Sequence, residues 1–387
     1  MPVINRIADF HGEIAAWRRD LHAHPELQYD VHRTADRVAT LLREFGVDEV
    51  VTGIGRTGVV GVIRGRGPGK TIGLRADMDA LPITERTGKP YASTVSGRMH
   101  ACGHDGHTAM LLGAARYLAE TRAFDGSAVV IFQPAEEGGA GGRAMVEDGL
   151  MGRFGIEEVY GMHNIPGLAA GSFGIREGGI MAASDQFSIL IEGVGGHAAL
   201  PHNTIDPVMV AAQLITALHT IVSRNVDPMR HAVLSVTMVE AGEAFNVIPR
   251  TVKLTGTIRT LDEQVRTVME TQLRTVTSSL VEAFGATAEI HYRHGYPVTV
   301  NAPAQTAYAA KVAAEIAGPE RVNANADATM GGEDFSYMLQ ARPGAYIFIG
   351  NGDSSELHTD TYDFNDDIIP AGVSYWVRLV ENASRTA

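Results

Sequence analysis

The spacing of hydrophobic residues near the start of the chain predicts two amphipathic helices. Ile7, Phe10, Ile14, Trp17 and Leu21 recur at steps of three and four, and a second set follows over residues 34–45. Short apolar runs at 57–65, 71–77, 127–133 and 158–164 then alternate with helical patterns at 106–120 and 141–150. Strands that alternate with helices predict an α/β fold, a mostly parallel sheet flanked by helices on both faces.

The pattern changes near residue 184. A strand over 184–196 is followed by a long helix over 206–226, for which Asp206 is a suitable N-cap and Pro207 a suitable first residue. Strands at 231–242 and 250–260, a helix at 261–285 and a strand at 287–295 complete the segment. The order strand, helix, two strands, helix, strand is that of a ferredoxin-like α+β unit. We therefore expect an inserted domain over 184–294.

The α/β pattern returns after this segment, with a helix over 303–318, a buried strand over 345–350 and a closing helix over 368–383. Residues 1–183 and 295–387 are accordingly expected to form one discontinuous domain. Two domains also suit a length of 387 residues, which is long for a single core.

Composition limits the class of protein. A hydrophobic content of 45% and a charged content of 20% fit a globular protein. The net charge of −13 argues against a nucleic-acid partner, which would require clustered Lys and Arg. No apolar run approaches the ~20 residues of a membrane span, and the N-terminus lacks a signal-peptide pattern. With a single cysteine, these features lead us to expect a cytoplasmic protein.

That single cysteine lies in the sequence HACGHDGH, residues 100–107. Cys102 and His104 are both good ligands for late transition metals, although an inert buried cysteine near surface histidines is the commoner arrangement. The adjacent carboxylates Glu136 and Glu137 follow an apolar strand, where one could bind a metal while the other faces the substrate. A solvated acidic turn is the alternative for this pair.

Two further histidines are candidate ligands: His163 at the end of an apolar strand, and His358 in a late loop. Cys102, His104, Glu137, His163 and His358 are too many ligands for one tetrahedral ion. They suit two ions about 3.5–4 Å apart that share a ligand. Glu136 would then remain as the general base. Asp77 and Asp79, after another strand, are expected to orient a ligating histidine, although a helix cap or a turn explains them equally well.

Taken together, the motifs resemble those of a family of dinuclear metallo-amidohydrolases. Those present, in the family's order, are RRDLHAHPEL, RADMDALP, MHACGHDGHTAML, FQPAEEGGAGG, GVGGHAALPH, FNVIP, GTIRT and GGEDFS. They resemble the branch of hippurate hydrolases, N-acyl-L-amino acid amidohydrolases and plant indoleacetyl-amino-acid hydrolases. The resemblance implies a catalytic domain with an inserted lid that also mediates homodimerisation.

The same resemblance assigns metal binding to the five candidate ligands and the role of base to Glu136. The wider family has a His-x-Asp motif and a bridging aspartate, whereas this chain has Arg75 before Asp77, so we favour Cys102 as the bridging ligand. In the lid, His197 is expected to stabilise the oxyanion, often in the partner's active site. Asn246 and Arg259 resemble substrate contacts, and Arg259 could bind a carboxylate through both guanidinium arms, or be an ordinary surface residue.

The implied reaction is hydrolysis of the amide bond of N-acyl-L-amino acids with two divalent metal ions, which could be Mn, Zn, Ni or Co. One alternative is a peptidase or deacetylase that acts on a biosynthetic N-acyl intermediate. The other is a non-catalytic, metal-dependent binding dimer, which would have no need for a base at Glu136.

Overall fold

The computed structural model describes residues 3–383, which divide into two compact units. The first unit takes in the chain up to residue 178, residues 300–327 and the chain from residue 334 onward. The second contains residues 179–299 and 328–333, so it reaches a few residues beyond 184–294 at each end. Each unit has its own cluster of buried apolar side chains. The role of the second unit as a lid and dimerisation domain stays a prediction.

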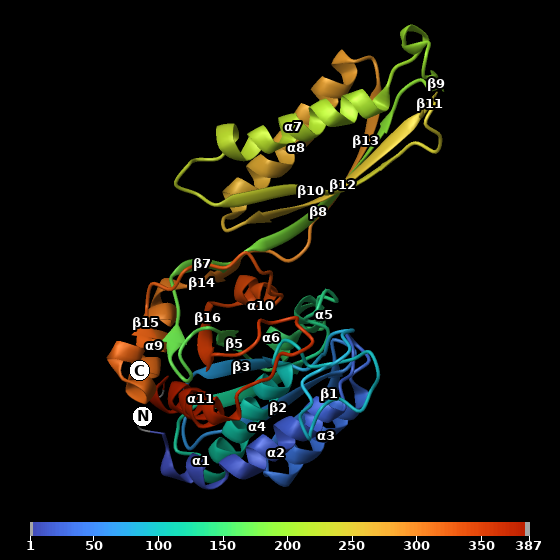
Figure 1. The fold of residues 1–387 in the computed structure, drawn as a ribbon. Helices are drawn as coiled ribbons and strands as arrows, with labels where there is room; N and C mark the ends of the chain where they lie inside the picture. Colours follow the sequence, from blue (N-terminus) through green and yellow to red (C-terminus); the bar gives the residue numbers. More distant parts are fainter. Residues whose placement is uncertain (1–2, 384–387) are drawn as a thin grey trace. The chain divides into compact units, whose positions relative to one another are not determined.

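An eight-stranded sheet forms the centre of the first unit (Figure 1). Its strands lie in the order β1 (Glu49–Ile54), β2 (Gly58–Arg64), β4 (Ser127–Gln133), β3 (Thr71–Asp77), β5 (Glu158–Pro166), β16 (Gly344–Gly352), β6 (Phe173–Gly174) and β15 (Val322–Asn323). The central strands β4, β3, β5 and β16 run parallel, whereas β1 and β2 form an antiparallel hairpin at one edge. The central strands are buried along most of their length, as expected for parallel strands covered on both faces. The mostly parallel sheet is therefore confirmed.

Helices flank this sheet (Figure 1). They are α1 (Asn5–Asp9), α2 (His11–Ala23), α3 (His32–Glu44), α4 (His104–Thr121), α5 (Gly141–Glu147), α6 (Leu150–Arg153), α9 (Pro303–Ala317), α10 (Ser336–Ala341) and α11 (Ile369–Ala383). The first predicted helix is in fact two, because Phe10 has a φ of −106°, outside the helical range, and buries its ring in the core. No helix among the described residues is long and apolar enough to cross a membrane.

The second unit has the predicted element order. It consists of β8 (Ala183–Glu192), α7 (Pro207–Asn225), β10 (Ala232–Ala241), β12 (Thr251–Thr260), α8 (Glu263–Ala283) and β13 (Thr287–Arg293). The sheet order β10-β12-β8-β13, with antiparallel neighbours, is that of a ferredoxin-like unit. Asp206 caps α7 by accepting the N–H of Val208, as predicted.

Several short strands complete the chain. In the second unit, β9 (Gly196–His197) pairs with β11 (Val247–Ile248) as a separate two-stranded ribbon. The short strands β7 (Gly178–Met181) and β14 (Thr299–Asn301) lie where the chain passes from one unit to the other.

Candidate metal centre

The candidate ligands of the first unit lie where the parallel strands end. β3 ends at Asp77, β4 is followed directly by the Glu136–Glu137 turn, and His163 lies near the end of β5. The turn of Cys102 and His104 begins α4, which packs against β3. Because the carboxyl ends of parallel strands share one edge of the sheet, these residues from distant parts of the sequence meet there.

Cys102 lies at the centre of the ligand cluster. Its Sγ is 3.4 Å from His163 Nε2 and 3.3 Å from His358 Nε2. The ligand atoms of Cys102, His104 and His163 all lie within 4.8 Å of one another, and so do those of Cys102, Glu137 and His358. The structure thus brings all five candidate ligands together as two groups of three that share one sulfur atom.

The ring orientations of two histidines suit metal binding. His104 Nδ1 donates to the backbone carbonyl of Asp79 at 2.8 Å, and His163 Nδ1 donates to the backbone carbonyl of Asn164 at 2.6 Å. In the neutral form of each ring, Nε2 therefore keeps its lone pair and faces the cluster. His104 Nε2 is buried and makes no hydrogen bond among the described residues, with Asp77 Oδ2 3.6 Å away. A buried acceptor without a partner is costly unless a ligand satisfies it, so this atom is suited to bind a cation.

The charge of the cluster also favours cations. Hydrogen bonds to Cys102 and Glu137 raise the pKa of His358 to about 10, because these neighbours favour a positive charge on the ring. Burial raises the pKa of the Cys102 thiol, so that this residue needs a nearby positive charge to become a thiolate.

Asp79 organises the Glu136–Glu137 turn. Its Oδ1 accepts the backbone N–H of Glu136 at 2.9 Å, and its Oδ2 accepts that of Glu137 at 3.1 Å. The turn begins with Ala135 in the left-handed region, at a φ of 53°, a conformation that needs such support. Glu136 is 7% exposed, and its carboxylate lies within 4.8 Å of the ligand atoms of His104 and Glu137.

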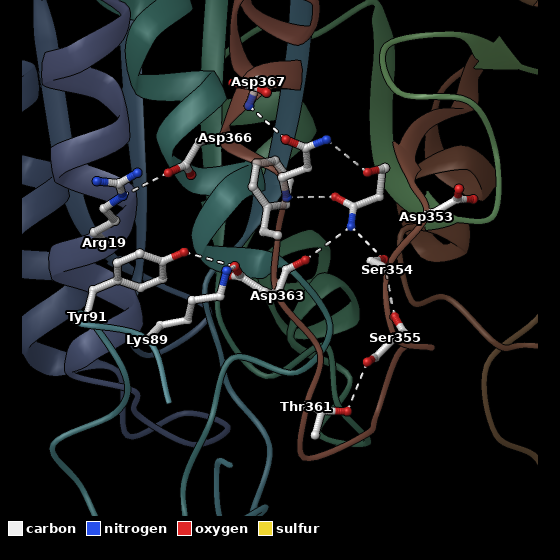
Figure 2. Close-up of a pocket in the computed structure, with 13 residues that line it drawn as sticks. Arg19, Lys89, Tyr91, Asp353, Ser354, Ser355, Thr361, Asp363, Asp366 and Asp367 are labelled. Atoms are coloured by element: carbon white, nitrogen blue, oxygen red, sulfur yellow. Dashed lines mark hydrogen bonds and ion pairs between the residues drawn. The ribbon is translucent and has the colours of Figure 1, made fainter. Parts of the chain in front are cut away.

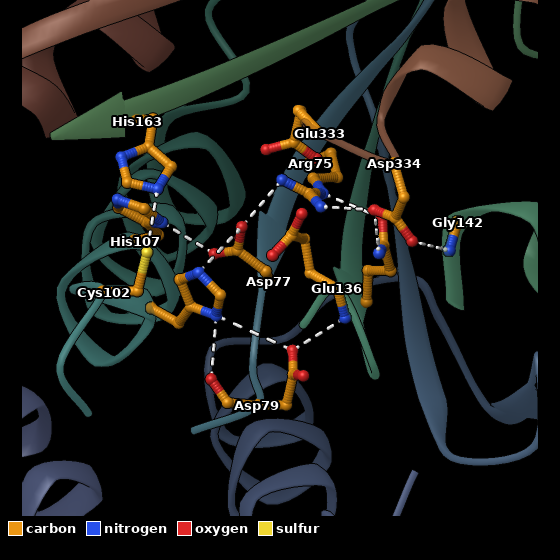
Figure 3. A network of polar contacts seen from close by, with 12 residues as sticks. Arg75, Asp77, Asp79, Cys102, His107, Glu136, Gly142, His163, Glu333 and Asp334 are labelled. Carbon is orange, nitrogen blue, oxygen red and sulfur yellow. Dashed lines mark hydrogen bonds and ion pairs between the residues drawn. The ribbon is translucent and has the colours of Figure 1, made fainter. Parts of the chain in front are cut away.

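Asp77 connects the cluster to a buried polar network (Figure 3). Its Oδ1 accepts from His107 Nδ1 at 2.6 Å, and its Oδ2 accepts from Arg75 Nη1 at 2.8 Å. Arg75 also donates to Gln133 Oε1 at 2.9 Å and to Asp334 Oδ1 at 3.0 Å. The guanidinium at position 75 therefore joins β3, β4 and the segment before α10.

His358 is carried by the loop between β16 and α11. Its backbone N–H donates to the carbonyl of Ala101 at 2.8 Å, which fixes this loop beside Cys102. On its other side the loop borders a polar cavity of about 450 Å³, where Asp363 accepts from Tyr91 Oη at 2.8 Å and pairs with Lys89 Nζ at 3.1 Å (Figure 2). None of the five candidate ligands lines this cavity, so we interpret these contacts as anchors of the His358 loop.

The second unit contains the other three residues singled out in the sequence. His197 lies on β9 and Asn246 directly precedes β11, and the N–H of Ala198 donates to the carbonyl of Asn246 at 3.1 Å. Both side chains are exposed. His197 Nδ1 accepts the N–H of Ala199 at 3.0 Å, so the neutral ring carries its proton on Nε2. Arg259 lies apart from them on β12, half-buried, and makes no ion pair with a carboxylate among the described residues.

Sequence reasoning missed several residues of the network. Arg75 and Asp334 stand inside the quoted motifs RADMDALP and GGEDFS, which was the only signal that they matter. His107 likewise stands inside MHACGHDGHTAML, whereas Asn164 and Tyr362 gave no signal beyond their nearness to the candidate ligands along the chain.

Comparisons with known proteins identify the family of the chain. The chain matches the family described as Peptidase family M20/M25/M40 over residues 73–382. It is 42% identical to a hippurate hydrolase of Campylobacter jejuni over 379 residues, 98% of each chain. It is 38% identical to an N-acetylcysteine deacetylase of Bacillus subtilis over 371 residues, 96% of each chain.

A solved structure, that of a dinuclear metal binding peptidase of the M20 family from Bacillus subtilis, superposes with a TM-score of 0.87 at 34% identity. The match covers 98% of this chain and 100% of that one. The resemblance inferred from the motifs is thereby confirmed. The chain belongs to peptidase family M20/M25/M40 and is a hydrolase of this amidohydrolase and peptidase family.

Proposed function

We propose that this protein hydrolyses the amide bond of N-acyl-L-amino acids, with two divalent metal ions bound by Cys102, His104, Glu137, His163 and His358. The observation that carries the proposal is the pair of three-ligand groups that share Cys102, with the carboxylate of Glu136 beside them. The substrate class comes from the names of the relatives, a hippurate hydrolase and an N-acetylcysteine deacetylase.

The donor set fits such a pair of ions. A thiolate, three imidazoles and a carboxylate suit Zn, Mn, Ni or Co, and the buried lone pair of His104 Nε2 calls for a cation. Bound ions would lower the pKa of a water molecule and polarise the acyl oxygen of the substrate. Asp77 and Asp79 would keep the ligands in position, through His107 and through the Glu136–Glu137 turn.

Glu136 is the proposed general base. Its carboxylate would take a proton from water while the water oxygen forms a bond to the acyl carbon. The same proton would then pass to the amide nitrogen as the carbon–nitrogen bond breaks, which leaves a carboxylic acid and a free amino acid. The low exposure of Glu136 favours this role, because bulk solvent is kept away from the carboxylate while it holds the transferred proton.

The second unit would supply the remaining contacts. His197 Nε2–H is the proposed donor to the oxyanion, from this chain or a partner chain. Arg259 would bind the carboxylate of the amino-acid part, which is consistent with a half-buried guanidinium that lacks a carboxylate partner. Asn246, in the turn just before β11 and beside His197, would be a further polar contact.

We also propose a homodimer formed through the second unit, and a cytoplasmic location in which the single cysteine remains reduced. The dimer proposal is supported by apolar side chains that the second unit leaves exposed, including Met209, Met238 and Val239. Light scattering of the full chain would test it: a mass of two chains supports the dimer, and a mass of one chain contradicts it.

The function is tested by amino-acid release from N-acetyl, N-benzoyl and N-indoleacetyl amino acids. The apo protein is reloaded with Mn, Zn, Ni or Co in turn, and a dipeptide serves as the peptidase comparison. Release that depends on the metal and on an N-acyl substrate supports the proposal. Cleavage of the dipeptide alone would indicate a peptidase, and release from N-acetyl substrates alone a deacetylase.

A further inference from the structure

Asn164 is fully buried beside His163, at the end of β5. Its side chain is hydrogen-bonded at both ends. Oδ1 lies 2.7 Å from His107 Nε2, a nitrogen that also accepts the backbone N–H of Asn164 at 3.1 Å, and Nδ2 donates to Tyr362 Oη at 2.5 Å. The amide therefore connects α4, which carries His104, to the loop that carries His358.

The Cys102–Gly103–His104 turn packs directly against this amide. Gly103 has a φ of +91°, in the left-handed region that favours glycine. A Cβ at this position would overlap Asn164 Oδ1 and would lie 2.7 Å from Tyr362 Oη. The turn that places the shared sulfur atom thus rests on Asn164 and Tyr362.

Tyr362 is also fully buried, and it lies four residues after His358. The His358 loop also contacts the cysteine turn through the hydrogen bond from His358 N–H to the carbonyl of Ala101 and through His358 Nε2, 3.3 Å from Cys102 Sγ. Asn164 and Tyr362 therefore contact or adjoin three of the segments that carry ligands: the cysteine turn, the end of β5 and the His358 loop.

His107 lies on the opposite side of Asn164 from Tyr362 in this series of hydrogen bonds. Its Nδ1 is hydrogen-bonded to Asp77 and its Nε2 to Asn164, so both ring nitrogens are engaged. Although Asp77, His104 and His107 could form a further ligand group, these hydrogen bonds give His107 a role in the polar network instead.

We propose that Asn164 and Tyr362 are positioning residues that hold the Cys102 turn against His163 and the His358 loop, so that one sulfur atom serves both ligand groups. The inference rests on the proposed dinuclear metal centre. Neither residue needs to touch a metal or a substrate. Their effect would be on the affinity for metal and on the geometry around the sulfur.

The test compares Tyr362→Phe with Tyr375→Phe. Both tyrosines are fully buried in the first unit, but the hydroxyl of Tyr375 has no hydrogen-bond partner among the described residues. The two variants lose the same atom, and only Tyr362→Phe loses the bond to Asn164. The Co²⁺ affinity of the apo protein is measured by chelator competition, together with the thiolate-to-cobalt charge-transfer absorption.

We expect Tyr362→Phe to weaken Co²⁺ binding by about 10-fold to 100-fold, as for other residues that orient ligands, and to change the charge-transfer band. Tyr375→Phe should match the wild type in both. Asn164→Ala, which removes both hydrogen bonds, should have a larger effect. Urea unfolding of each apo variant shows whether a loss of affinity only reflects a loss of folding.

Wild-type affinity and spectrum in Tyr362→Phe would overturn the inference while leaving the proposed function intact. Equal losses of metal affinity in Tyr362→Phe and Tyr375→Phe would also overturn it. A wild-type protein that binds no Co²⁺ would instead contradict the proposed metal centre, and this inference with it.

Discussion

The carboxylate of Asp79 accepts the backbone N–H groups of Glu136 and of Glu137, so one buried side chain holds both the proposed base and a proposed ligand. Asp79 also provides the carbonyl that fixes the ring of His104. This residue, two positions after the end of β3, therefore sets the geometry of two other ligand-bearing segments. These contacts give the Asp79 carboxylate a structural role distinct from that of the proposed ligand Glu137 and the proposed base Glu136.

Asp79→Asn nearly keeps the size of the buried side chain and therefore tests its role as the acceptor for the two backbone N–H groups. The amide has one acceptor oxygen, so one of the two buried N–H groups loses its partner, at a cost of about 1–3 kcal/mol of stability. Displacement of Glu136 should lower kcat at least about tenfold. Asp327→Asn, at an exposed position, is the control and should change neither quantity. The two quantities are measured by urea unfolding and by kcat on N-benzoylglycine. Wild-type values of both for Asp79→Asn would refute the role of Asp79 in holding the Glu136–Glu137 turn.

Glu136→Gln should abolish turnover without loss of metal. The substitution keeps the size of the side chain but removes the proton acceptor, so kcat should fall by about 10² to 10⁴. Metal content should stay at the wild-type value, because Glu136 is outside the five proposed ligands. A variant that loses its metal together with its activity would show that Glu136 is a ligand and not the base.

Arg259→Gln should affect only substrates with a free carboxylate. Loss of a charged hydrogen bond of about 1.5–3 kcal/mol should lower kcat/KM for N-benzoylglycine by about 10-fold to 150-fold. For the neutral N-benzoylglycinamide, kcat/KM should be unchanged. Arg224→Gln, exposed on α7, is the matched control. Equal losses on both substrates would argue against binding of the carboxylate.

The second unit should have an acid-sensitive ion pair. Asp185 is buried on β8 and accepts two hydrogen bonds from Arg266, at 2.6 and 2.9 Å. Burial alone would raise the pKa of Asp185, but the hydrogen bonds from Arg266 and Tyr292 outweigh it and lower the pKa. A carboxyl with a lower pKa in the folded state stabilises that state above its unfolded pKa, near 4, and loses this contribution as the pH falls through the folded value.

Asp185→Asn should therefore destabilise the protein by about 3 kcal/mol near pH 7, because it removes the buried carboxylate partner of Arg266 and leaves only Glu263, at 3.4 Å and half exposed. The difference from the wild type should shrink as the pH falls below about 4. Glu243→Gln, at an exposed position of the same unit, should have no such effect. Urea unfolding at a series of pH values tests this, and a difference that stays constant with pH would contradict the assignment.

Much of the fold could be predicted from the local spacing of apolar residues. The helices α3, α4, α7, α8, α9 and α11 and the strands β3, β4, β5 and β8 lie within a few residues of their predicted positions, because their apolar spacing is regular. The break at Phe10 could not be predicted, since that residue continues the helical spacing and leaves the helix only to bury its ring. The antiparallel β1–β2 hairpin depends on strand pairing, which spacing along the chain does not encode.

The candidate ligands could be predicted because residues at the ends of parallel strands meet at one edge. Asp77 and Asp79 were also expected as supports, but Asp334, Asn164 and Tyr362 could not be predicted, because each depends on contacts between distant segments. Asp334 lies 259 residues from Arg75 in the sequence, and Tyr362 lies 198 residues from Asn164. An isolated asparagine or tyrosine gives no local sign that such a partner exists.

The central claim is that Cys102 is a ligand shared by two metal ions in a hydrolytic centre. It is tested most directly by the metal content and N-acyl amino acid hydrolysis of Cys102→Ala beside the wild type, both reloaded from the apo state. We predict two ions per chain and metal-dependent release for the wild type, and fewer ions with loss of release for the variant. A Cys102→Ala protein with full metal content and full activity would contradict the account.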